Sequence, residues 1–258
     1  MKPFHHIKAI VFDADDTLWA LQNHFEYVED AYCALLEKYG SKEEISASLF
    51  ATETANMEDL GYGVKAFIIS LVENAIKVSN GEVSAELIGR IVSLGKSLLH
   101  IDATPLPEVA STLKYLAEKC QADVDADRTV DRKLRLAVFT KGELKDQENK
   151  LKRSGLLPCF DDVRIVSDKT PQAYHQLCRE LDVHPYEMVM VGNSFKSDIA
   201  PALEIGAYAI HIPFHTIWAH EKIDEFEHER LRRITHFSEI IPIVEGKDVA
   251  NEKSNARN

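Results

Sequence analysis

The stretch that decides the fold is Ile7-Lys8-Ala9-Ile10-Val11-Phe12-Asp13-Ala14-Asp15-Asp16-Thr17-Leu18-Trp19. Its apolar, β-branched first half is typical of a strand buried on both faces of a parallel sheet. Three acids follow within four residues. Carboxylates beside a buried strand are costly unless they are paired, hydrogen-bonded or bound to a metal. We therefore expect them just past the carboxyl end of the strand, where open α/β sheets bind ligands. The alternative is that the acids only start a helix, since helix N-termini favour them.

Composition and charge describe an ordinary globular protein of 258 residues, with 45% hydrophobic and 28% charged residues. The net charge of -12 argues against binding to nucleic acid or to anionic membranes, which requires basic patches. The four cysteines form no CxxC pair, which indicates reduced thiols. We find no signal-peptide pattern and no apolar run of membrane-spanning length, so we expect a soluble, cytoplasmic protein. No sequence pattern indicates an oligomeric state.

After Trp19, apolar residues recur at helical spacing for about eighty residues. Four amphipathic helices separated by short loops are predicted near residues 25–39, 45–60, 64–76 and 87–99, and together they indicate a small bundle. Beyond this block, strands predicted at 134–139, 163–166, 188–191 and 208–212 alternate with helices. This alternation predicts an α/β fold with a doubly wound, right-handed parallel sheet.

The bundle is therefore predicted to be an insertion after the first strand. Residues 1–18 and 101–258 form the expected Rossmann-like core, and residues 19–100 form the expected four-helix cap. We also predict a charged helix at about 219–233 and a disordered polar tail at 246–258.

Polar groups follow four of the predicted strands, and a parallel sheet brings such groups to one edge. They are Asp13 and Asp15, Thr140, Lys169, and Asn193 with Asp198. These groups suit phosphoryl transfer. Asp13 would be the carboxylate nucleophile, and Asp15 would protonate the leaving group and then deprotonate water. Lys169 and Mg²⁺ would offset the charge of the phosphate, while Thr140 and the backbone amide of Lys141 would bind its oxygens.

These residues resemble the motifs of the haloacid dehalogenase superfamily. The first motif is similar to Asp13-x-Asp15-x-Thr17, the second to Thr140, and the third to Lys169. The resemblance implies Mg²⁺ held by the Asp13 carboxylate, the Asp15 backbone carbonyl and the fourth motif, under a helical cap that opens and closes over small phosphorylated metabolites. Dehalogenating and phosphonate-cleaving relatives lack an acid at position 15, so Asp15 implies a phosphate ester.

The fourth motif departs from the family pattern, because Asn193 stands where the family usually has Asp. An amide oxygen can still bind Mg²⁺, but it brings no charge. Asp198 is the alternative source of the missing carboxylate, directly or through water, and Asn193 alternatively only shapes the turn. We therefore name four residues for the metal site: Asp13, Asp15, Asn193 and Asp198.

Residues near the motifs are candidates for substrate binding: Thr17, Trp19, Tyr62, Thr140, Lys141 and Lys169. For Trp19 and Tyr62, packing in the core is the alternative role. The sequence thus predicts a Mg²⁺-dependent phosphatase for a small phosphorylated metabolite such as a nucleotide, flavin mononucleotide or a sugar phosphate. The alternatives are a receiver-type phosphoacceptor module, against which the large insertion counts, and a degenerate relative that binds without catalysis.

Overall fold

The computed structural model describes residues 4, 6–126 and 134–246. A six-stranded parallel sheet has the order β3-β2-β1-β4-β5-β6, with β1 in its interior. The strands are β1 (Ala9–Phe12), β2 (Arg135–Lys141), β3 (Asp162–Val166), β4 (Met188–Gly192), β5 (Tyr208–His211) and β6 (Leu231–Arg233). The predicted α/β fold class is confirmed, and the short edge strand β6 was not predicted.

Helices cover both faces of the sheet. They are α5 (Val109–Ala126), α6 (Leu144–Arg153), α7 (Pro171–Glu180), α8 (Ala200–Glu204) and α9 (Ile240–Val244). A π-helical turn at Phe195–Ile199 leads into α8, and short 3₁₀ turns lie at Glu37–Tyr39, Leu98–His100, Leu157–Cys159, Pro185–Glu187, Ala219–Glu221 and Phe237–Glu239.

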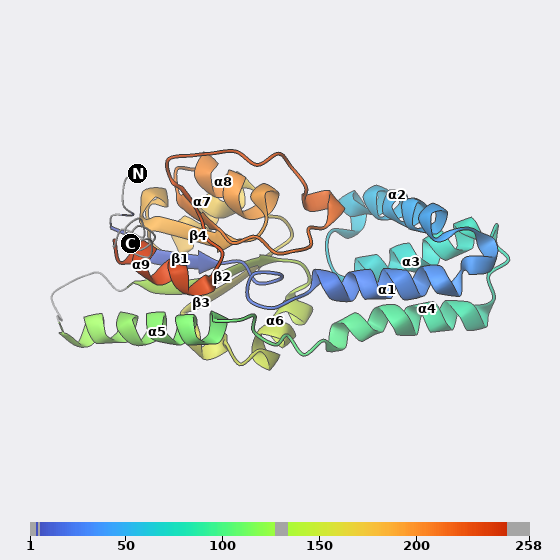
Figure 1. Ribbon diagram of the computed structural model, residues 1–258, viewed down its shortest axis with the longest axis horizontal. Coiled ribbons are helices and arrows are strands. Elements are labelled where there is room, and N and C mark those ends of the chain that lie inside the picture. Colours follow the sequence, from blue (N-terminus) through green and yellow to red (C-terminus); the bar gives the residue numbers. More distant parts are fainter. Residues whose placement is uncertain (1–3, 5, 127–133, 247–258) are drawn as a thin grey trace, which may run out of the picture.

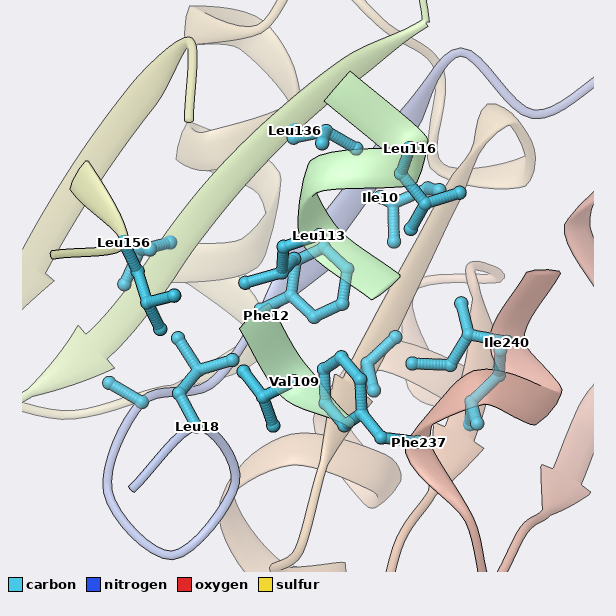
Figure 2. Packing of buried hydrophobic residues seen from close by; sticks show 14 of the residues in the cluster. Ile10, Phe12, Leu18, Val109, Leu113, Leu116, Leu136, Leu156, Phe237 and Ile240 are labelled. Carbon is cyan, nitrogen blue, oxygen red and sulfur yellow. The ribbon is translucent and has the colours of Figure 1, made fainter. Parts of the chain in front are cut away.

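The alternation of side chains along β1 explains the two layers of helices. Ile10 and Phe12 point to one face, where they pack with α5 and α9 residues such as Val109 and Ile240 (Figure 2). Ala9 and Val11 point to the other face, and their cluster includes Tyr174 of α7 and Ala202 of α8. Every residue of β1 is buried, as the apolar run predicted for a strand covered on both sides.

The four helices between β1 and α5 form a bundle at one end of the elongated molecule (Figure 1). They are α1 (Gln22–Leu35), α2 (Lys42–Leu60), α3 (Val64–Val78) and α4 (Ala85–Ser97), and they share one apolar core. Asp16 fixes the start of α1, because its Oδ1 accepts hydrogen bonds from the backbone amides of Leu21 (2.7 Å) and Gln22 (3.0 Å). We call these four helices the cap; the exact division of the chain into domains stays a prediction.

The predicted charged helix at 219–233 is wrong. Apart from a single 3₁₀ turn at Ala219–Glu221, the segment is irregular until β6. Arg233 pairs with Glu225 and Glu227 and donates to the carbonyl of Phe226. These charges therefore fold a loop back onto the edge of the sheet instead of lining a helix.

Two other predictions concern the polar tail and the absence of a membrane-spanning helix. The predicted tail at 246–258 lies outside the described residues except for Gly246. Among the residues that the structure describes, no helix has the length and apolar character needed to span a bilayer. The cytoplasmic location stays a prediction.

Candidate active site

The carboxyl ends of the parallel strands converge on one cavity of about 200 Å³ between the sheet and the cap. The backbone amide of Asp13 donates to the carbonyl of Val191 at 2.9 Å, so the sheet pairing continues one residue past β1. Thr140 is buried near the end of β2. The predicted residues that line the cavity are Asp13, Asp15, Tyr62, Thr140, Lys141, Lys169, Asn193 and Asp198. The fold therefore brings together groups that are distant in sequence.

A buried ion cluster forms the floor of this cavity. Nζ of Lys169 lies 2.5 Å from Oδ1 of Asp13 and 2.7 Å from Oδ1 of Asp198. Burial raises the pKa of the Asp13 carboxyl to about 7, with Lys169 opposing the rise and Asp198 adding to it. Burial alone would lower the pKa of Lys169, but the two carboxylates outweigh burial and raise it. Lys169 is thus held as a cation between two carboxyl groups.

Gly192 makes this cluster possible. A β-carbon at this position would overlap the carboxyl group of Asp198. Without one, Asp198 lies against the backbone, where its Oδ2 accepts from the amide of Ser194 at 3.0 Å and its Oδ1 accepts from Lys169. Both oxygens of Asp198 are therefore engaged by protein donors.

Thr17 is buried beside Asp13 and is not among the residues that line the cavity, so its contact with substrate stays a prediction. Its hydroxyl lies 3.0 Å from Oδ2 of Asp13 and 3.2 Å from Oδ1 of Asn193. One hydroxyl hydrogen cannot serve both acceptors fully. The two side chains therefore place more oxygen acceptors around Thr17 than it has donors.

An oxygen-rich group of this kind suits a hard divalent cation such as Mg²⁺. Within the described ranges, no three His, Cys, Asp or Glu side chains are grouped as a metal site. The expected set differs from such a cluster, because beside the carboxylates of Asp13 and Asp198 it uses an amide oxygen of Asn193 and the backbone carbonyl of Asp15. The excess of acceptors at Asp13 and Asn193 fits this set.

Asp15 is held by four contacts that sequence reasoning missed. Its Oδ1 accepts from Nε1 of Trp19 and from Nζ of Lys150, both at 2.8 Å. Its Oδ2 accepts from Nε2 of Gln147 at 2.6 Å and from Nζ of Lys150 at 2.9 Å. Gln147 and Lys150 lie three residues apart on α6, which follows β2 directly, and this spacing was the available signal.

Trp19 does not line the cavity, contrary to the expectation. Its side chain is fully buried in the core cluster beneath the sheet, and only its indole N–H reaches Asp15. A tryptophan can fill an apolar core while its one polar atom finds a partner. Core packing, the alternative role, is therefore the one the structure shows.

Lys141 is less available to an anion than its position beside Thr140 suggested. It pairs with Glu221, donates to Oγ of Ser197 at 2.8 Å, and lies 3.8 Å above the ring of Tyr62. Burial alone would raise the pKa of Glu221, but Lys141 and hydrogen bonds from Ser194 and Ser197 lower it. Lys141 lines the cavity as predicted, but its charge is already balanced by Glu221.

Glu221 belongs to the loop between β5 and β6, which was mistaken for a helix. This loop, drawn in orange to red, reaches across to α2 (Figure 1). His220 stacks on Phe50 of α2 with 4.3 Å between ring centroids, and Trp218 meets Tyr62 edge-on at 5.8 Å. The loop therefore joins the core to the cap beside the cavity.

The cap contributes the remaining wall of the cavity. Its side chains mix aromatic, polar and acidic groups: Gln22, Phe25 and Glu29 of α1, Glu53, Asn56 and Met57 of α2, and Val64, Ala66, Phe67 and Ser70 of α3. Burial raises the pKa of Glu53 to about 7, and Glu29 adds to the rise. The cap wall is thus more acidic than an anion-binding surface would be, so we expect the anion site at the sheet.

A family model described as haloacid dehalogenase-like hydrolase matches residues 7–206, which span all the site residues on the sheet side from Asp13 to Asp198. The chain belongs to this family. The resemblance seen in the sequence motifs is thereby confirmed, and the protein is a hydrolase of the haloacid dehalogenase-like family.

Individual relatives agree with this assignment. Glyceraldehyde 3-phosphate phosphatase of Methanothermobacter thermautotrophicus is 28% identical over 218 residues, covering 79% of this chain and 84% of the relative. A haloacid dehalogenase-like hydrolase structure from Xanthomonas campestris has 28% identity and a TM-score of 0.77, over 93% of this chain and 92% of the other. L-2-haloacid dehalogenase from Xanthobacter autotrophicus, 18% identical with a TM-score of 0.61 over 94% and 100% of the two chains, shows the fold alone.

Proposed function

We propose that this hydrolase cleaves small phosphate monoesters through a phosphorylated Asp13, with Mg²⁺ as its cofactor. The observation that carries the proposal is the pair of carboxyl groups at positions 13 and 15 in one cavity, with Lys169 on the first and hydrogen-bond donors on the second. A halide leaves carbon without a proton, whereas an alkoxide leaving phosphorus requires one. The acid at position 15 therefore favours a phosphate ester. The curated phosphatase relative supports the same class of substrate.

The side chains divide the reaction into two balanced steps. In the first, a carboxylate oxygen of Asp13 forms a bond to phosphorus, the bond from phosphorus to the ester oxygen breaks, and that oxygen takes a proton from Asp15. In the second, the oxygen of a water molecule attacks the same phosphorus and gives a proton to Asp15, while the bond to Asp13 breaks. The sum is ester plus water giving alcohol plus phosphate, with Asp13 and Asp15 restored.

Charge explains why a cation is part of the proposal. Lys169 is shared by Asp13 and Asp198, so this cluster is not positive before a phosphate arrives. Each unit-charge repulsion at about 4 Å costs roughly 4 kcal/mol at an effective dielectric near 20. A bound Mg²⁺ supplies two positive charges against this repulsion. We propose Asp13, Asn193 and the carbonyl of Asp15 as its ligands. Asp198 would instead hold Lys169 in place, because its Oδ1 accepts from Lys169 and its Oδ2 accepts from the amide of Ser194.

The substrate would place its phosphate at the sheet and the rest of the molecule against the cap. The cavity of about 200 Å³ is smaller than the roughly 300–1,000 Å³ of typical ligand pockets, which favours the smaller of the candidate substrates. Sugar phosphates, nucleotides and flavin mononucleotide remain the candidate classes, and a panel of such compounds would rank them by kcat/KM.

The test is release of phosphate from p-nitrophenyl phosphate with Mg²⁺ and with EDTA. We expect turnover with Mg²⁺, loss of turnover with EDTA, and loss of turnover in Asp13→Asn. Asp102→Asn is the matched control, because Asp102 is exposed and lies outside the cavity. Unchanged turnover in Asp13→Asn would refute the assignment of the nucleophile. Binding of vanadate without turnover at any Mg²⁺ concentration would instead favour the degenerate, binding-only alternative.

A further inference from the structure

We propose that Lys150 and Gln147 are positioning residues that hold the carboxyl group of Asp15 in place for its two proton transfers. This inference rests on the proposed phosphatase function and assigns a role to two residues of α6. Lys150 reaches both oxygens of Asp15, at 2.8 and 2.9 Å, and Gln147 donates to one of them at 2.6 Å. Three side chains thus fix one carboxyl group, the third being Trp19.

Burying the charged ammonium group of Lys150 costs free energy unless the group is paired. The side chain of Lys150 is 2% exposed, and such a charge must be paired to be tolerated. Its partners are Asp15 and Asp146, whose Oδ2 lies 3.4 Å away. Because two carboxylates share one ammonium group, Lys150 has no net positive charge to offer a phosphate. This favours a role acting through Asp15 over a role as a direct phosphate ligand.

The orientation of the Gln147 amide also supports a positioning role. Its Nε2 donates to Asp15 and to the carbonyl of Lys141 at 3.0 Å, while its Oε1 is buried with no hydrogen-bond partner among the residues that the structure describes. A buried acceptor without a partner loses its hydrogen bonds to water and gains none in return, which destabilises the fold. The opposite orientation would place Oε1 against the Asp15 carboxylate, so the amide has one usable orientation. In that orientation it restrains Asp15.

The dependence of kcat/KM on the leaving group separates a positioning role from a general disruption of the active site. p-Nitrophenolate leaves phosphorus without a proton, whereas phenolate, with the basicity of a tyrosine side chain of pKa about 10, benefits from an acid. The two esters are close in size. The ratio kcat/KM covers only the steps up to release of the phenol, and kcat also includes hydrolysis of phosphorylated Asp13, which needs Asp15 as a base.

We therefore expect a specific pattern in Lys150→Met. Its kcat/KM for phenyl phosphate should fall at least about tenfold, within the roughly 10²–10⁴-fold that a complete general acid supplies. Its kcat/KM for p-nitrophenyl phosphate should stay within about threefold of wild type, while kcat and KM fall together and one equivalent of p-nitrophenolate appears as a burst. Lys152→Met is the matched control on α6, since Lys152 is 62% exposed and should change neither ester.

Three further variants keep the test decisive. Gln147→Met removes one donor, leaves the ion pair, and should shift the ratio of the two esters in the same direction, even if Lys150→Met does not fold. In an Asp15→Asn background, Lys150→Met should change the ratio by less than about twofold, because groups that act through one residue are not additive. Lys150→Arg, which keeps the charge, should recover part of the activity on phenyl phosphate.

The outcomes distinguish this inference from the proposed function. Equal losses of kcat/KM on both esters, absence of a burst, or additive effects in Asp15→Asn would overturn the positioning role while wild-type turnover still depended on Asp13. No hydrolysis of either ester by wild type, or full activity of Asp13→Asn, would overturn the proposed function and this inference with it.

Discussion

Glu53 of α2 carries a carboxyl group whose charge should destabilise the cap. Burial raises its pKa from the ordinary 4.5 to about 7, and Glu29 on α1 adds to the rise. A carboxyl with a raised folded pKa binds its proton more tightly in the folded state than in the unfolded chain. The contribution of Glu53 to the free energy of unfolding is therefore fully present below about pH 4.5 and is lost as the pH rises from there to about 7.

The magnitude follows from the width of that window. A difference of about 2.5 pKa units at 1.36 kcal/mol per unit gives roughly 3 kcal/mol. Glu53 is only partly buried, so solvent screens some of this, and we expect Glu53→Gln to gain about 1–2 kcal/mol of unfolding free energy at pH 8. Most of that gain should disappear at pH 4.5, where the native carboxyl is protonated.

Urea unfolding followed by circular dichroism at pH 4.5 and pH 8 measures this difference. Glu58→Gln is the matched control, since Glu58 lies on the same helix and is exposed. An equal gain at both pH values would show that the effect comes from packing and not from charge. A loss of stability at pH 8 would show that Glu53 is held as a carboxylate by a favourable contact, and would refute the reasoning.

Three further predictions concern the sheet side of the cavity. Gly192→Ala should force Asp198 out of its buried ion cluster, with a loss of about 3–5 kcal/mol of unfolding free energy in urea and a collapse of turnover. Asn193→Asp should add a charged oxygen ligand and lower the Mg²⁺ concentration that gives half-maximal activity. Glu221→Gln should release the charge of Lys141 toward the cavity and lower the KM for p-nitrophenyl phosphate, most clearly at low salt.

Two of these predictions have a control variant within the chain, and the third has a defined contradicting result. Gly89→Ala lies in α4 with open space around its β-carbon, and should stabilise by about 0.5–1 kcal/mol, so a loss there would show that the effect of Gly192→Ala is not specific. Glu229→Gln changes an exposed charge in the same loop as Glu221 and should leave KM unchanged. A higher Mg²⁺ requirement in Asn193→Asp would contradict the proposed ligand set.

The sequence allowed the sheet side of the site to be predicted because parallel strands share an edge. The apolar run ending at Phe12 placed Asp13, and the same reasoning placed Lys169 and Asn193, which line the same cavity. These predictions needed only the order of the strands and the polar residue after each. That residues from different strands lie close together can then be predicted without knowing how the side chains pack.

The residues that were missed depend on tertiary contacts. Lys150 lies in a strongly polar helix, so its burial follows from where α6 docks and not from its sequence pattern. Trp19 has both an apolar body and a donor, and its sequence position did not show which one would face the site. The segment around Glu221 has the charge pattern of a surface helix, yet its charges pair with Lys141 across the cavity and with Arg233 at the sheet edge.

The most direct test of the central claim is to trap the phosphorylated enzyme. Rapid mixing with p-nitrophenyl phosphate and Mg²⁺, quenching in acid and peptide mass spectrometry would locate the phosphoryl group. We predict a hydroxylamine-sensitive phosphoryl group on the peptide that contains Asp13, present in wild type, more abundant in Asp15→Asn and absent in Asp13→Asn. Turnover by wild type with no phosphorylated peptide, or with the group on another residue, would contradict the account.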